Sequence, residues 1–131
     1  MKIENIKFKA KRLDGKGWVE GSLLRSTAGI KERAYIVDNF SSMSDYSVIG
    51  VDHSTVCQFT GLKDREGKEI WEGDIVHDSY DRLCIDNLYE VVYIEEEGTF
   101  AFKSLDKVDN YEPFVNLFEV YVVGNKFDKK K

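Results

Sequence analysis

The side chains best suited to acid–base chemistry are concentrated in one stretch near the middle of the chain. Two carboxyl groups can share acid and base roles when a cleft holds them at a fixed separation. Here, basic residues alternate with the acidic ones, and three glycines recur at six-residue intervals. This pattern favours solvated turns over a catalytic pair. The acidic residues concerned are Asp64, Glu66, Glu69, Glu72 and Asp74.

Two short segments contain the residue types that bind zinc or manganese, namely Asp52-His53 and Asp74-x-x-His77-Asp78. The chain has two histidines, and neither segment has the spacing of a metal-site motif. We expect Asp74 to accept hydrogen bonds from backbone amides of its own turn instead. The sequence therefore predicts no bound metal and no other cofactor.

Cys57 is a potential nucleophile only if a base lies beside it, and His53 is the nearest candidate. On a single strand the two residues would share a face but lie about 13 Å apart, too far for a hydrogen bond. We therefore expect Cys57 to be a small core residue. The sequence has no nucleophile elbow, phosphate-binding glycine loop or dinucleotide motif. The chain is predicted not to be an enzyme.

A basic face near the N-terminus is the candidate site for nucleic acid. Residues 6–13 alternate between apolar and basic types, as in a half-buried strand, and a tryptophan on the next strand could stack a base. We favour the alternative that the lysines keep a solvent-facing or edge strand from pairing with neighbours, because the net charge is −5. The candidate contacts are Lys7, Lys9, Lys11, Arg12 and Trp18.

Length and composition predict one soluble domain in a reducing compartment. The 131 residues suffice for a self-contained core, and no apolar run approaches the length of a membrane span. The two cysteines are far apart, which favours a cytoplasmic location. We expect an N-terminal hairpin and loop region over 1–50, a barrel-like region over 51–125 and a flexible tail over 126–131.

Short alternating runs separated by Gly, Asp and Asn predict a mainly β fold of seven or eight strands, with at most one or two short helices. Asp14 to Gly17 and Lys63 to Lys68 are the clearest turns. Serine-rich Phe40 to Tyr46 is predicted to be a mobile loop. Further strands are expected over 18–24, 33–37 (ended by Asp38-Asn39), 48–59 (kinked near Asp52 and ended by Thr60-Gly61), 88–94, 99–102 and 117–123 (ended by Gly124-Asn125). Polar loops are expected over 25–31, 77–87 and 106–113.

Aromatic residues make up 13% of the chain and fall on alternating faces of the expected strands. Most should fill the core, and tyrosines left outside would suit a protein interface. The residues considered are Trp71, Tyr89, Tyr93, Phe100, Phe102 and Phe118.

The central stretch resembles the YopX family, whose members are small proteins carried by bacteriophages and prophages. The resemblance lies in Thr55-Val56, Gln58 to Asp64, Gly67 to Ile70 and Glu72 to Val76, and it extends more loosely to both ends of the chain. Cys57 stands where the family usually has glycine, and Trp71 where it more often has tyrosine. The fold-defining positions are Thr60, Gly61, Asp64, Gly67, Glu72, Gly73 and Asp74.

The resemblance implies a phage or prophage origin, a bacterial cytoplasm and self-association. The Glu-Gly-Asp turn and its following strand are also similar to those of small, partly open barrels of the Src-homology-3 type. Our first hypothesis is a non-enzymatic interaction protein whose partner is another protein or a second copy of itself. The alternative hypothesis is a nucleic-acid-binding module that uses the basic N-terminal hairpin; no membrane partner is expected.

Overall fold

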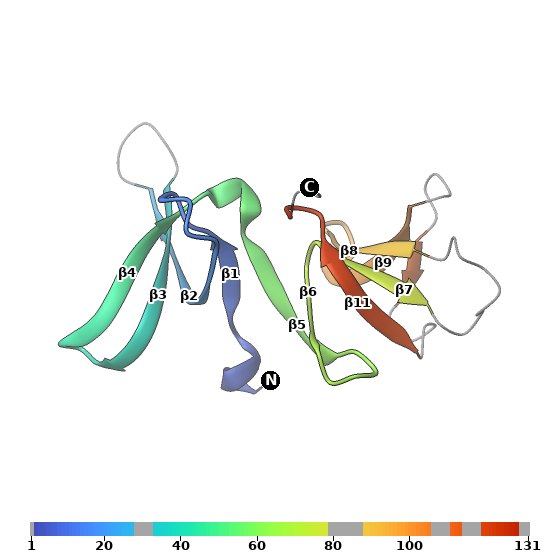
Figure 1. Cartoon of the computed structure of the whole chain (residues 1–131), viewed down its shortest axis with the longest axis horizontal. Helices are drawn as coiled ribbons and strands as arrows, with labels where there is room; N and C mark the ends of the chain where they lie inside the picture. The colour runs from blue at the N-terminus through green and yellow to red at the C-terminus, as the bar shows by residue number, and fades with distance from the viewer. Residues whose placement is uncertain (1, 28–32, 79–87, 106–110, 114–118, 129–131) are drawn as a thin grey trace. The chain divides into compact units, whose positions relative to one another are not determined.

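The structure is a computed structural model that describes residues 2–27, 33–78, 88–105, 111–113 and 119–128 (Figure 1). The described residues form eleven strands and two 3-10 helices of three residues each, so no helix there is long enough to cross a membrane. The elements are η1 (Ile3–Asn5), β1 (Phe8–Lys11), β2 (Trp18–Ser26), β3 (Arg33–Ser42), β4 (Asp45–Val51), η2 (His53–Thr55), β5 (Cys57–Lys63), β6 (Glu69–Trp71), β7 (Asp74–Asp78), β8 (Leu88–Ile94), β9 (Thr99–Ser104), β10 (Tyr111–Pro113) and β11 (Val120–Asn125).

The strands form two antiparallel sheets, which confirms the prediction of a mainly β fold. The orders are β4-β3-β2-β1-β5-β6 and β10-β9-β8-β7-β11, and neither sheet closes into a barrel within the described part of the chain. The chain divides into two compact units, Met1–Phe59 and Thr60–Lys131. The two units meet within β5, between Phe59 and Thr60.

In the first unit, the alternation of apolar and basic residues builds the predicted hairpin. β1 and β2 pair with Ala10 opposite Val19, and both side chains are buried. Their core also contains Ala34, Ile36 and Val51. The predicted turn after β1 is confirmed, because Gly15 and Gly17 have φ values of 79° and 93°, which only glycine reaches without strain.

The edge of β1 that does not face β2 is bonded to two strands, β5 and β4. The first residues of β1, Phe8 and Lys9, pair with β5. At its other end, Leu13 N donates to Gly50 O at 3.1 Å and Asp52 N donates to Lys11 O at 2.9 Å. The end of β4 is therefore bonded to the end of β1, and only the first part of β4 is left at the edge of the sheet.

The predictions for residues 38–59 were partly wrong. β3 continues through Asp38-Asn39 to Ser42, and the serine-rich segment forms the β3–β4 hairpin in place of a mobile loop. Ser41 Oγ donates to the Asp45 carboxylate at 2.8 Å, so the serine hydroxyl that suggested a loop stabilises the hairpin instead. The expected kink at Asp52 is present, but a 3-10 turn follows it because Asp52 caps η2 through Ser54 N.

In the second unit, β8 begins and ends as predicted, whereas β9 and β11, and also β5 at the division between the units, end later than expected. Pairing explains the later end of β11, because Val120 to Asn125 pair with β7 and a bulge after Val122 accommodates Gly124 within the strand. The core contains Ile70, Val76, Val91, Phe102 and Val120. Tyr111–Pro113 forms β10 beside β9 where a polar connection was expected.

Some predictions concern residues that the structure does not describe. These are most of the loop at 25–31, nearly all of that at 77–87, the region 106–110, the beginning of the last strand with Phe118, and the end of the tail at 129–131.

Candidate functional site

The central acidic stretch forms two hydrogen-bonded turns within the second unit. Asp64 Oδ1 accepts from Glu66 N at 2.9 Å and from Lys68 N at 2.8 Å. Its Oδ2 accepts from Val122 N at 3.0 Å, across 58 residues of sequence. Asp64 therefore ties the β5–β6 turn to the last strand, and both carboxylate oxygens are used by backbone amides.

Asp74 fixes the next turn in the same way. It is 2% exposed, and its Oδ2 accepts from Trp71 N at 2.8 Å. Its Oδ1 accepts from Asn125 Nδ2 at 3.0 Å, so this turn is also bonded to β11. The prediction that Asp74 bonds to an amide of its own turn is confirmed. The two buried carboxylates of the stretch thus hold turns together.

Two of the three regularly spaced glycines, Gly67 and Gly73, lie in these turns, whereas Gly61 lies within β5. Gly61, Gly67 and Gly73 have φ values of 85°, 84° and 85°, in the left-handed region. Gly73 N donates to Val91 O at 2.7 Å, and Gly73 O accepts from Lys126 N at 2.9 Å. The turn at Gly73 therefore also bonds to β8 and to the residue that follows β11.

The pKa of Asp64 is lowered from its ordinary value of 3.8. Burial acts to raise this pKa, but the three backbone N–H donors and the charge of Lys68 together outweigh burial. Because the folded pKa lies below the unfolded one, the stabilisation is complete above pH 3.8 and is lost as the pH falls through the folded pKa.

We expect Asp64→Asn to lower the free energy of unfolding at pH 7 by about 1–3 kcal/mol, because the amide NH2 then faces a backbone donor. The deficit should shrink as the pH falls below 3.8 and through the lower folded pKa, where the wild-type carboxylate also becomes neutral. Urea unfolding of both proteins between about pH 7 and pH 2.5 measures this. A deficit that stays constant across this range would contradict the assigned role of the charge.

The candidate nucleic-acid contacts lie together on the first unit, apart from Arg12. Lys9 Nζ and Lys11 Nζ lie 4.9 Å and 5.5 Å from the centre of the Trp18 ring. Lys7 Nζ lies 4.8 Å from the centre of the Phe59 ring. The three lysines are half-buried on these rings, so a base that stacked on Trp18 would have to displace lysine side chains.

Arg12 takes part in a different interaction. Its Nη2 donates to Asp14 Oδ2 at 2.7 Å, and its Nε contacts both oxygens of the same carboxylate. The pKa of Asp14 is lowered, first by this hydrogen bond and then by Lys16 N. Arg12 thus stabilises the β1–β2 turn that Asp14 begins.

Charge is unevenly distributed between the two units. Met1–Phe59 contains nine Lys and Arg against seven Asp and Glu, a net charge of +2. Thr60–Lys131 contains ten against seventeen, a net charge of −7. The whole-chain value of −5 therefore conceals a weakly basic first unit and a strongly acidic second one.

The other chemical candidates have structural roles. Cys57 is fully buried, and its Sγ donates to Thr55 O at 3.2 Å, which confirms that it is a core residue. His53 lies in η2, so the two residues do not share a strand as the separation argument assumed. Among the residues that the structure describes, no three His, Cys, Asp or Glu side chains are grouped closely enough to hold a metal.

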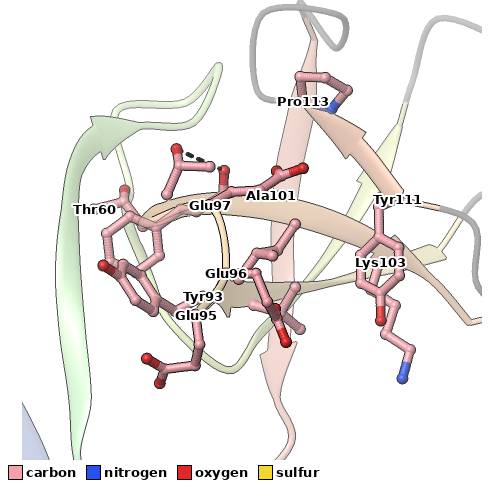
Figure 2. Close-up of a pocket in the computed structure, with 13 residues that line it drawn as sticks. Thr60, Tyr93, Glu95, Glu96, Glu97, Ala101, Lys103, Tyr111 and Pro113 are labelled. Carbon is pink, nitrogen blue, oxygen red and sulfur yellow. Dashed lines mark hydrogen bonds between the residues drawn. The ribbon is translucent and has the colours of Figure 1, made fainter.

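The second unit contains a groove of 880 Å³ that the sequence did not reveal (Figure 2). Tyr93 was expected in the core with the other aromatics, but it is 38% exposed and lines the groove. Its ring packs edge-to-face on Phe100 with centres 5.2 Å apart. By contrast, Trp71 and Phe102 are buried as predicted. The groove is lined by Thr60, Val92, Tyr93, Ile94, Glu95, Glu96, Glu97, Thr99, Phe100, Ala101, Lys103, Tyr111 and Pro113.

The groove follows the β8–β9 hairpin and ends at β10. Figure 2 shows Thr60 and Tyr93 at one end, and Lys103 beside Tyr111 at the other. Strand pairing explains the second end, because Lys103 is opposite Tyr111 and Ala101 is opposite Pro113. The alternation of apolar and polar residues along β8 and β9 did not reveal the groove, because one end of the groove is formed by β10. That segment was predicted from the sequence to be a connection without strand structure.

Two antiparallel sheets with carboxylate-bonded turns define a small, mainly β protein. The chain belongs to the YopX family, because the family model described as YopX protein matches residues 7–130. The resemblance noted in the central stretch is thereby confirmed over nearly the whole chain.

A solved structure similar to this chain is the crystal structure of protein EF1440 from Enterococcus faecalis. The TM-score is 0.52 at 21% sequence identity, and the match covers 92% of each chain. At this identity the similarity concerns the fold alone. No curated protein matches the sequence.

Proposed function

We propose that this chain is a non-catalytic protein of phage or prophage origin, located in the bacterial cytoplasm, that acts by binding protein and assembles with a second copy of itself. The observation that supports self-assembly is the edge strand β4, the last strand in the order of its sheet. It carries no charged residue between Tyr46 and Val51, and Val48 is 48% exposed. An edge strand of this kind is a template for pairing with another chain.

The other edges have features that oppose such pairing. β10 has three residues and contains Pro113, which has no N–H to donate. β11 has the bulge between Val122 and Gly124, and β6 has three residues. Among the described strands that end a sheet, β4 alone combines seven residues with no proline and no bulge within it.

The direction of the backbone groups fits pairing at β4. Gly50 O accepts from Leu13 N, so the polar groups of Gly50 point away from β3. Because strand residues alternate, the N–H and C=O of Val48 point the same way. The carbonyl of Gly50 is already bonded to Leu13, so two copies of β4 arranged antiparallel about a twofold axis would pair through the first part of the strand, including the backbone groups of Val48.

The outer face beside this edge supports the same occupant. Val48 lies opposite Val37, and Leu24 of β2 lies opposite Tyr35 of β3. Leu24 is half exposed, like Val48, and alternation places all four side chains on one face of the sheet. A second copy added at β4 would cover part of this apolar surface and gain hydrophobic free energy.

We expect Val48→Lys to weaken self-association by at least about tenfold, because each dimer would then hold two lysines close to its twofold axis. Sedimentation equilibrium over a range of protein concentrations measures the change. Leu105→Lys is the matched control, because Leu105 has the same 48% exposure and lies in the second unit. A wild type that stays monomeric, or equal effects of the two variants, would refute the β4 interface.

A second candidate function is nucleic-acid binding by the first unit, which is favoured by its net positive charge and by the three lysines gathered over two aromatic rings. The double variant Lys7→Glu, Lys9→Glu should then abolish binding of a fluorescent single-stranded oligonucleotide, and wild-type binding should weaken steeply with salt. Lys63→Glu with Lys68→Glu makes the same charge change in the second unit and should retain binding. No binding by wild type at low salt would remove this candidate.

A further inference from the structure

The groove of the second unit has acidic residues at the hairpin turn and one basic residue on β9. Glu95, Glu96 and Glu97 are consecutive, exposed and part of the groove lining. None of the three forms an ion pair or hydrogen bond through its side chain with any described residue. Three adjacent carboxylates without a counter-charge repel one another, so a cationic group placed beside them would be stabilised.

The turn that carries these glutamates has a fixed backbone. Gly98 N donates to Ile94 O at 2.8 Å, and Glu97 N donates to the same oxygen at 3.1 Å. Ile94 then pairs with Thr99 at the start of β9. The carboxylates are therefore presented on a closed hairpin turn, which lowers the entropy that binding would have to remove.

Between its charged ends, the groove is mostly apolar. Val92 and Ala101 are opposite each other on β8 and β9, and the next pair on that face adds Ile94. Pro113 and Tyr111 extend the surface on β10. The volume of 880 Å³ lies within the range of sites that take small molecules or short peptide segments.

We propose that this groove binds an extended peptide segment of a partner protein that carries lysine or arginine next to apolar residues. The basic side chains would pair with Glu95, Glu96 and Glu97, and the apolar ones would cover Val92 and Pro113. The net charge of −7 on this unit would attract such a segment from a distance. This proposal rests on the proposed function as a protein-binding module, but it concerns another surface and another partner.

Isothermal titration with an acetylated octapeptide, Lys-Lys-Leu-Thr-Val-Thr-Leu-Thr, tests the proposal. Amide chemical shifts recorded in parallel should change in the segment 92–101. The same peptide with glutamate in place of both lysines should show no measurable binding. The triple variant Glu95→Gln, Glu96→Gln, Glu97→Gln should bind the lysine peptide at least about tenfold more weakly.

A matched control separates the groove from general acidity. Glu4→Gln, Glu20→Gln, Glu66→Gln changes the net charge equally at exposed positions outside the groove, and its affinity should stay within about twofold of wild type. Equal losses in both triple variants, equal binding of both peptides, or no binding at all would overturn the proposal. The titration is repeated in the Val48→Lys variant, so failure of the β4 interface and failure of the groove give different results.

Discussion

Asp74→Ala is expected to lower the free energy of unfolding of the second unit by about 3–5 kcal/mol. The substitution removes the acceptor of Trp71 N and of Asn125 Nδ2, and both hydrogen bonds lie in the interior. Each buried donor left without a partner costs about 1–3 kcal/mol. The turn would also lose its side-chain link to β11, so the effect should exceed that of deleting an exposed charge.

Two variants test this explanation of the Asp74 effect. Asp74→Asn keeps one carbonyl oxygen and should lose about half as much stability, because its NH2 then faces one of the two donors. Glu66→Ala removes an exposed carboxylate of the neighbouring β5–β6 turn and should change stability by no more than about 0.5 kcal/mol.

Fluorescence of buried Trp71 during urea unfolding, measured in a Trp18→Phe background, reports on the second unit alone. An Asp74→Ala loss no larger than that of Glu66→Ala would contradict the structural role of the carboxylate.

Gly21→Ala is expected to have the largest effect on the first unit, about 3 kcal/mol or more. A Cβ built at Gly21 would overlap with the backbone oxygen of Val37 and would crowd Ile36 Cγ2 at 3.1 Å. Ile36 is fully buried and Val37 is held in the β2–β3 ladder, so neither can move without disturbing the core. The cost therefore comes from overlap with backbone and not from a lost contact.

Other glycines provide graded controls for this steric argument. Gly15→Ala has open space but a φ of 79°, so it should cost about 1–2 kcal/mol from the left-handed backbone alone. Gly124→Ala has open space and no positive φ and should change stability by no more than about 0.5 kcal/mol. Urea unfolding followed by circular dichroism measures the series. If Gly21→Ala is no more destabilising than Gly15→Ala, that result would contradict the close approach of the Val37 backbone oxygen to Gly21.

The turns were predictable because their chemistry is local. A glycine with positive φ is required wherever the chain reverses tightly, and an aspartate oxygen can reach amides two to four residues away. Gly67 and Asp64 illustrate this, since Asp64 Oδ1 binds the amides of residues 66 and 68. The same local reading correctly placed Asp14 and Gly15 at the first hairpin.

The errors occurred where a strand partner decides the conformation. Asp38 and the serines after it disfavour strands locally, yet β3 continues because β4 supplies the ladder hydrogen bonds. Tyr111–Pro113 was predicted to be part of a polar connection, but it forms strand β10 because it pairs with β9. Tyr93 has the alternation of a core residue, but it lies on the part of the hairpin that extends beyond Val91 and Phe102.

By itself, the sequence determined the mainly β fold, the positions of the tight turns and membership of the YopX family, because these depend on residue type and short-range spacing. Only the tertiary structure decided that Asp64 and Asp74 bond to β11, that the first part of β4 lies at the edge of its sheet, and that three glutamates border a groove. Each of these features requires segments distant in sequence to be brought together, and local patterns carry no information about which distant segments will pair.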